Sequence, residues 1–158
     1  MHVDRLERYW MWAASGMLAL FLSAIVVTAV MGSAHPPSHT EMVNPETLTV
    51  SGEFATPGVS TRTDGGVTVA LRAEFYVFRP EVIRVPIGRP VTFRITSADV
   101  LHGFQIVGTN VNLTVAPGYV SEATNTFTRA GEYLVVCNEY CGLAHHLMQA
   151  KVIVEAPQ

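Results

Sequence analysis

The sequence has little charge, and long stretches of it carry none. Asp, Glu, Lys and Arg make up 15% of its 158 residues, whereas 49% are hydrophobic. No charged residue occurs from Tyr9 to Met31, and no Lys or Arg occurs between Arg8 and Arg62. The first absence leaves an apolar segment long enough to cross a hydrocarbon core of about 30 Å. The second absence predicts the orientation of this segment in the membrane. Positive charges that lie only before a span favour a cytoplasmic N-terminus.

A single transmembrane helix is therefore predicted for residues 9–31, after a cytoplasmic N-terminus of residues 1–8. Tyr9, Trp10 and Trp12 suit one membrane interface, where aromatic rings with a polar group are favoured. A cleaved signal peptide is the alternative, with Gly-Ser-Ala at residues 32–34 as its cleavage site. The apolar run is longer than a usual signal core, which favours a retained anchor.

The rest of the chain divides at a change in composition. Residues 32–66 are rich in Pro and Gly, which predicts a linker. From Val67 onward, short segments that alternate apolar and polar residues are separated by Gly and Pro turns, which predicts an all-β sandwich or barrel over residues 67–158. Seven basic and seven acidic residues leave this domain near neutral, so strong electrostatic steering is not indicated and no nucleic-acid partner is expected.

The two cysteines of the chain lie together in C-N-E-Y-C-G-L-A-H-H-L-M, residues 137–148. Cys137 and Cys141 are four residues apart, and His145 and Met148 follow them. Thiolate, imidazole and thioether groups all bind copper. Because a mononuclear blue-copper site uses one cysteine, the second thiolate suggests two copper ions bridged by both sulfurs. A second histidine is then needed, and His102 is the candidate.

Two other interpretations of the cysteine pair remain open at this point. Cys137 and Cys141 can form a disulfide in an exported domain, where the compartment is oxidising. They can also bind zinc together with His145. Met148 argues against zinc, because a thioether is a poor ligand for that ion.

The 137–148 segment resembles the binuclear copper (Cu-A) loop of cytochrome c oxidase subunit II, C-x-E-x-C-G-x-x-H-x-x-M. The segment D-V-L-H-G-F around His102 resembles the upstream histidine region of the same family. The resemblance extends over roughly residues 70 to 155 and implies that Cys137 and Cys141 bridge two copper ions. It further implies one imidazole for each ion, a weak thioether ligand and a backbone carbonyl ligand, from His102, His145, Met148 and Glu139.

The resemblance also implies a fold and a function. The expected fold is an all-β, cupredoxin-like Greek-key β-barrel with a single N-terminal transmembrane helix. One span rather than two is similar to the B-family (ba-type) haem–copper oxidases. The implied role is electron entry: Cu-A accepts electrons from cytochrome c and passes them to haem in the catalytic subunit I, where oxygen becomes water and protons are pumped. The chain is then an enzyme only as a subunit, with its copper domain on the outer side of the cell membrane.

Three further roles follow from the resemblance. Glu7, just before the span, is either a solvated carboxylate at the membrane interface or, as the resemblance implies, a residue that helps protons enter the catalytic subunit. The Glu139 side chain is expected to contribute to a Mg site at the contact with that subunit. The segment F-Y-V-F-R-P at residues 75–80 resembles an aromatic segment that lies near the copper ligands in the family, and its Tyr76 and Phe78 are expected to form an apolar docking face for the donor.

Two other functions remain as alternatives. One is the Cu-A subunit of a nitric oxide reductase, since the final acceptor is chosen by the catalytic subunit. The other is a membrane-anchored protein that binds or delivers copper, which needs an exchangeable ion. The intact ligand set argues against the quinol-oxidase relatives of the family, because these lack the copper ligands.

Overall fold

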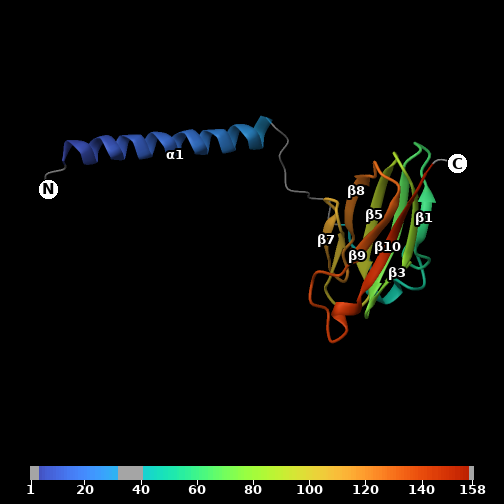
Figure 1. The fold of residues 1–158 in the computed structure, drawn as a ribbon. Helices are drawn as coiled ribbons and strands as arrows, with labels where there is room; N and C mark the ends of the chain where they lie inside the picture. The colour runs from blue at the N-terminus through green and yellow to red at the C-terminus, as the bar shows by residue number, and fades with distance from the viewer. Residues whose placement is uncertain (1–3, 32–40, 157–158) are drawn as a thin grey trace. The chain divides into compact units, whose positions relative to one another are not determined.

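The structure, a computed structural model, describes residues 4–31 and 41–156. It contains two compact units, an N-terminal helix and a β-rich domain (Figure 1). Residues 1–3 of the predicted N-terminus, residues 32–40 of the predicted linker and residues 157–158 lie outside the described part of the chain.

The N-terminal helix α1 spans Arg5–Met31 and begins four residues before the predicted start. Asp4 explains the earlier start, because its Oδ1 accepts a hydrogen bond from the Leu6 amide at 2.8 Å and caps the helix. Glu7 lies in the first turn, where a negative charge favours the helix dipole. The helix is long and apolar enough to cross a membrane, and its apolar side chains are exposed on all sides within its unit.

The β-rich domain consists of two five-stranded sheets. The first has the order β1-β2-β5-β8, with β3 also paired to β2; its strands are Gly58–Thr61 (β1), Val67–Glu74 (β2), Val77–Arg79 (β3), Pro90–Ser97 (β5) and Ser121–Thr126 (β8). The second has the order β4-β10-β9-β6-β7, from Val82–Pro86 (β4), Gln149–Glu155 (β10), Gly131–Val136 (β9), His102–Ile106 (β6) and Asn112–Val115 (β7). The pairs β2–β5 and β4–β10 are parallel, and the others are antiparallel. Because β7 contacts β8 and β1 contacts β4, the sheets approach each other at both sides, as in a barrel.

Apolar side chains from both sheets meet in one core. β4 and β10 alternate exposed and buried residues, as expected for strands with one face toward the core. Three fully buried rings lie at the centre, where Phe104 of the second sheet packs edge-on against Phe78 at 5.5 Å and beside Phe93 at 5.9 Å, both of the first sheet. Packed strands of this kind hold the loops at their ends in fixed positions.

Much of the predicted linker is folded onto the first sheet. We call residues 41–57 the strap. Its Leu48 and Phe54 are buried against Ala70 in a small second core. Arg72 donates a hydrogen bond to the Phe54 carbonyl at 2.7 Å, and Arg94 pairs with two glutamates of the strap. Leu48 and Phe54 are six residues apart in a Pro- and Gly-rich segment and show no helix or strand periodicity. The composition of this segment therefore predicts a linker, although in the structure it packs as the strap and continues into β1.

Candidate metal centre

The potential ligands come from two places that the second sheet brings together. His102 is the first residue of β6, and Cys137 directly follows β9. The two strands are antiparallel, with Gln105 opposite Val136, so the start of β6 lies beside the end of β9. Residues 137–148 form the loop from β9 to β10, and we call them the copper loop. This topology brings a histidine to a cysteine 35 residues later.

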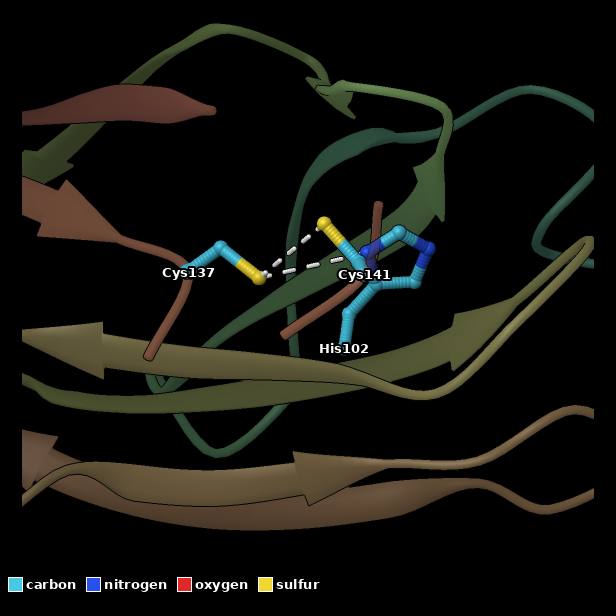
Figure 2. A group of neighbouring side chains, drawn as sticks. All are labelled: His102, Cys137 and Cys141. Atoms are coloured by element: carbon cyan, nitrogen blue, oxygen red, sulfur yellow. Dashed lines mark hydrogen bonds between the residues drawn. The ribbon is translucent and has the colours of Figure 1, made fainter. Parts of the chain in front are cut away.

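Three side chains converge at the start of this loop (Figure 2). The Cys137 sulfur lies 3.8 Å from the Cys141 sulfur and 3.9 Å from Nδ1 of His102. All three residues are buried, and their ligand atoms lie within 4.8 Å of one another. Both cysteines are free thiols, and the sulfurs are far beyond the 2.05 Å or so of a disulfide bond. The alternative of a disulfide between Cys137 and Cys141 is therefore not formed in this structure.

The rest of the predicted ligand set surrounds the same two sulfurs. The Cys141 sulfur lies 3.6 Å from Nδ1 of His145 and 3.8 Å from the Met148 sulfur, which is also buried. The Cys137 sulfur lies 3.2 Å from the Glu139 carbonyl oxygen. All six predicted groups are thus assembled, and each cysteine has its own imidazole neighbour.

The spacing of these donors suits soft metal ions. A thiolate bond to a first-row metal is about 2.3 Å long, as for zinc. Sulfurs that lie 3.8 Å apart are close enough for one ion to bond to both Cys137 and Cys141. Two thiolates, two imidazoles, a thioether and a carbonyl form a donor set that copper favours. Burial raises the pKa of the Cys141 thiol to about 11, and the Cys137 sulfur adds to this shift, so the metal must displace a proton.

Asp99 orients the upstream histidine. Its Oδ1 lies 2.7 Å from Nε2 of His102 and accepts a hydrogen bond from the Val100 amide, while its Oδ2 accepts one from the Phe75 amide. Asp99 therefore both contacts the ring and caps the turn. With Nε2 held by a carboxylate, Nδ1 of His102 faces the sulfurs. A carboxylate behind a ligating imidazole is the usual outer partner in metal sites.

The predicted docking pair behaves differently at its two positions. Phe78 is fully buried, so the prediction that it contacts a donor is wrong. It pairs with Ala73 of β2, and the pleat turns its ring toward the core. Tyr76 is half-buried, and its hydroxyl lies where a side chain on Gly142 would be, 2.6 Å from the position of a Cβ atom. Phe75, by contrast, is 52% exposed.

Three exposed apolar side chains of the copper loop were missed by sequence reasoning. They are the non-ligand residues Tyr140, Leu143 and Leu147. Their positions in the sequence could have indicated this exposure, because residues that alternate with ligands in a short loop cannot all face the metal. We call them, with Phe75, the apolar rim. Glu7, the predicted proton-entry residue, is exposed in the first turn of α1.

Comparison with known proteins places the chain in a family. The sequence pattern described as "Cytochrome C oxidase subunit II, periplasmic domain" matches residues 71–156. The chain belongs to the cytochrome c oxidase subunit II family. Its relative "Cytochrome c oxidase subunit 2" of Thermus thermophilus is 38% identical over 153 residues, 94% of this chain and 91% of that one. "Alternative cytochrome c oxidase subunit 2" of Bradyrhizobium diazoefficiens is 42% identical over 74 residues, 47% of this chain and 27% of that one.

Two solved structures resemble the chain in fold. A chain of a heme-copper terminal oxidase dimer, solved by cryo-EM, has a TM-score of 0.64 and 32% identity, and the match covers 96% of this chain and 100% of that one. The periplasmic domain of subunit II of cytochrome oxidase of Bradyrhizobium japonicum has a TM-score of 0.54 at 18% identity, covers 64% of this chain and 88% of that one, and bears on the fold alone. The predicted family and cupredoxin-like barrel are confirmed. As a subunit II, the chain is part of an oxidoreductase complex of the membrane and associates with a catalytic subunit.

Proposed function

We propose that this chain is the electron-entry subunit of a terminal respiratory oxidase and holds a binuclear Cu-A centre. Electrons arrive from a cytochrome c and leave to haem in the catalytic subunit, where oxygen is reduced to water and protons are pumped. When bound, the copper pair supplies a one-electron redox centre. The single observation that carries this proposal is the pair of buried free thiols, 3.8 Å apart, with one imidazole beside each.

The positions of the ligands within the fold support electron transfer rather than copper delivery. His102 is fully buried, and both cysteines and Met148 are at most 7% exposed. A delivery protein needs an ion that a partner can reach and remove, whereas buried ligands slow exchange. Ligands fixed by two packed sheets also relax little when the charge of the centre changes. Little relaxation keeps the barrier to electron transfer low.

The donor is proposed to dock on the apolar rim. Leu143 is 90% exposed, Tyr140 77% and Leu147 65%. These side chains belong to the loop that carries four side-chain ligands, so a donor seated on them comes close to the centre. Tyr76, at the edge of the same surface, remains a predicted docking residue. Exposed large apolar groups that cluster beside a redox site are typical of an interaction surface.

The membrane topology and two acidic residues complete the proposal. Helix α1 is a single membrane span, with its N-terminus in the cytoplasm because Arg5 and Arg8 precede the span. The β-rich domain then lies on the periplasmic or extracellular side. Glu7 helps protons enter the catalytic subunit from the cytoplasm, and the Glu139 side chain contributes to Mg binding at the contact with that subunit.

The experiment that tests the proposal is a copper titration of the full chain in detergent, followed by reduction with a cytochrome c. Two copper ions per chain and one-electron reduction by the donor support the proposal. A single ion, or copper that a weak chelator removes within seconds, contradicts it and favours a blue-copper or delivery role. A Cys141→Ser variant serves as the control, because it removes one bridging sulfur and should lose the pair.

A further inference from the structure

An asparagine pair outside the ligand set joins the copper loop to the neighbouring hairpin. Nδ2 of Asn138 donates a hydrogen bond to Oδ1 of Asn112 at 2.9 Å. Asn138 directly follows Cys137, and Asn112 is the first residue of β7. Neither asparagine belongs to the predicted ligand set. We call this hydrogen-bonded pair the amide clasp.

The clasp crosses β6 above a glycine. The pairing of Gln105 with Val136, continued by two residues, sets Gly103 opposite Asn138. A Cβ atom on Gly103 would lie 1.9 Å from Oδ1 of Asn138 and 2.8 Å from the Glu139 amide nitrogen. Any larger residue at position 103 must therefore displace the copper loop. The missing side chain is what lets the asparagine amide reach from the end of β9 to β7.

The clasp involves residues next to two of the ligands, because Gly103 follows His102 and Asn138 follows Cys137. Alternate residues of a strand face opposite sides, and the neighbours of Gly103 are the buried His102 and Phe104. The side-chain position of Gly103 therefore faces the opposite side, toward Asn138. Its amide also donates to the Cys137 sulfur at 3.4 Å. The clasp thus links the copper loop to the hairpin that contains His102. The Gly103 N–H···S hydrogen bond to Cys137 lies between these two segments.

We propose that Asn138 and Asn112 are positioning residues that set the Gly103 N–H···S contact to Cys137 and thereby tune the copper centre. The inference rests on the proposed Cu-A function. A hydrogen bond to a thiolate withdraws charge from the sulfur, which favours reduced copper, and such bonds are known to set the potential of copper–thiolate sites. Loosening the clasp should weaken this bond, lower the midpoint potential and speed the loss of copper.

The test compares substitutions at one exposed position in the full chain in detergent, loaded with copper. Asn112→Leu keeps the size of the side chain but removes the acceptor oxygen, whereas Asn112→Asp keeps an acceptor for Asn138. Asn110→Leu is the matched control, because Asn110 lies exposed in the same hairpin and its side chain forms no hydrogen bond with residues 4–31 or 41–156. The readouts are the midpoint potential, the thiolate-to-copper absorption bands and the rate of copper loss to a chelator.

For Asn112→Leu we expect copper to be lost about tenfold faster, as is typical when an outer partner of a metal site is removed. Its potential should fall and its charge-transfer bands should shift, while Asn112→Asp and Asn110→Leu stay close to the unsubstituted chain. The inference is overturned if Asn112→Leu matches Asn110→Leu, or if Asn112→Leu and Asn112→Asp change equally. Failure of the unsubstituted chain to bind a copper pair would instead overturn the proposed function.

Discussion

Nε2 of His102 lies 2.7 Å from Oδ1 of Asp99, and Nδ1 of the same ring faces the Cys137 sulfur. The two nitrogens of one imidazole are thus assigned to two tasks by their neighbours. A carboxylate in this position fixes the ring and makes it a better donor to a metal. His102 is fully buried, so the ring has little freedom to find another orientation.

Loss of the Asp99 carboxylate should weaken the copper site. We expect Asp99→Ala to lower copper affinity about 10- to 100-fold, the usual effect of removing such a partner. Asp99→Asn keeps an oxygen that can accept from Nε2 of His102, so it should retain most of the affinity. Competition with a chelator measures the copper affinity of both variants. Equal losses for the two would show that the charge, and not the orientation of the ring, is what matters.

Copper binding should strengthen as pH rises. Burial raises the pKa of Cys141 to about 11, so near neutral pH its thiol is protonated and must release the proton to bind as thiolate. Protons therefore compete with copper, and affinity should rise about tenfold per pH unit for each proton released. Titrations between about pH 6 and pH 8, corrected for protonation of the chelator, measure this slope. A flat profile would mean that the thiol is already ionised.

The packing of the strap against the first sheet should depend on Arg94. This side chain pairs with Glu41, Glu53 and Glu122 at 2.6 to 2.8 Å, and its hydrogen bond to Glu53 is the main cause that raises its pKa above the ordinary value. We expect Arg94→Met to lower the free energy of unfolding by about 1–3 kcal/mol, because it breaks a partly buried network of charged hydrogen bonds. Urea unfolding of the full chain in detergent measures the change.

A matched variant separates this network from an ordinary surface pair. Arg84 bonds Glu155 at 2.8 Å, and both side chains are more than half exposed. Arg84→Met should therefore cost less than about 1 kcal/mol. Neither variant should alter the absorption of the copper centre, because both arginines lie outside the ligand set. A similar decrease in the free energy of unfolding for the two variants would contradict the conclusion that the Arg94 network stabilises the domain more than a surface ion pair does.

Phe78 and Leu143 should show opposite phenotypes. Phe78 is fully buried, and Phe78→Ala should destabilise the domain by about 3–5 kcal/mol. Leu143 is 90% exposed, so Leu143→Ala should leave stability within about 0.5 kcal/mol of the original while slowing reduction by cytochrome c. Unfolding curves and stopped-flow reduction distinguish the two effects. An unchanged rate for Leu143→Ala would remove the apolar rim as the docking surface.

The sequence predicts the site better than its surroundings, for physical reasons. Ligands identify themselves by chemistry and spacing, as Cys137 and Cys141 do, and long alternating strands such as β5 and β10 show their period. Phe78 lies in a strand of three residues, β3, too short to reveal which face turns inward. β7 has only four residues, which is likewise too short for a clear alternation. The strap is held by contacts such as Arg94 to Glu41, 53 residues apart, which no local pattern contains.

The most direct test of the central claim is an electron paramagnetic resonance spectrum of the copper-loaded full chain, recorded together with the copper content per chain. Cys137 and Cys141 are proposed to bridge two ions that share one unpaired electron. Two copper nuclei of spin 3/2, coupled equally, give a seven-line hyperfine pattern, and that result with two copper ions per chain is expected. A four-line pattern with one copper ion per chain would contradict the binuclear centre.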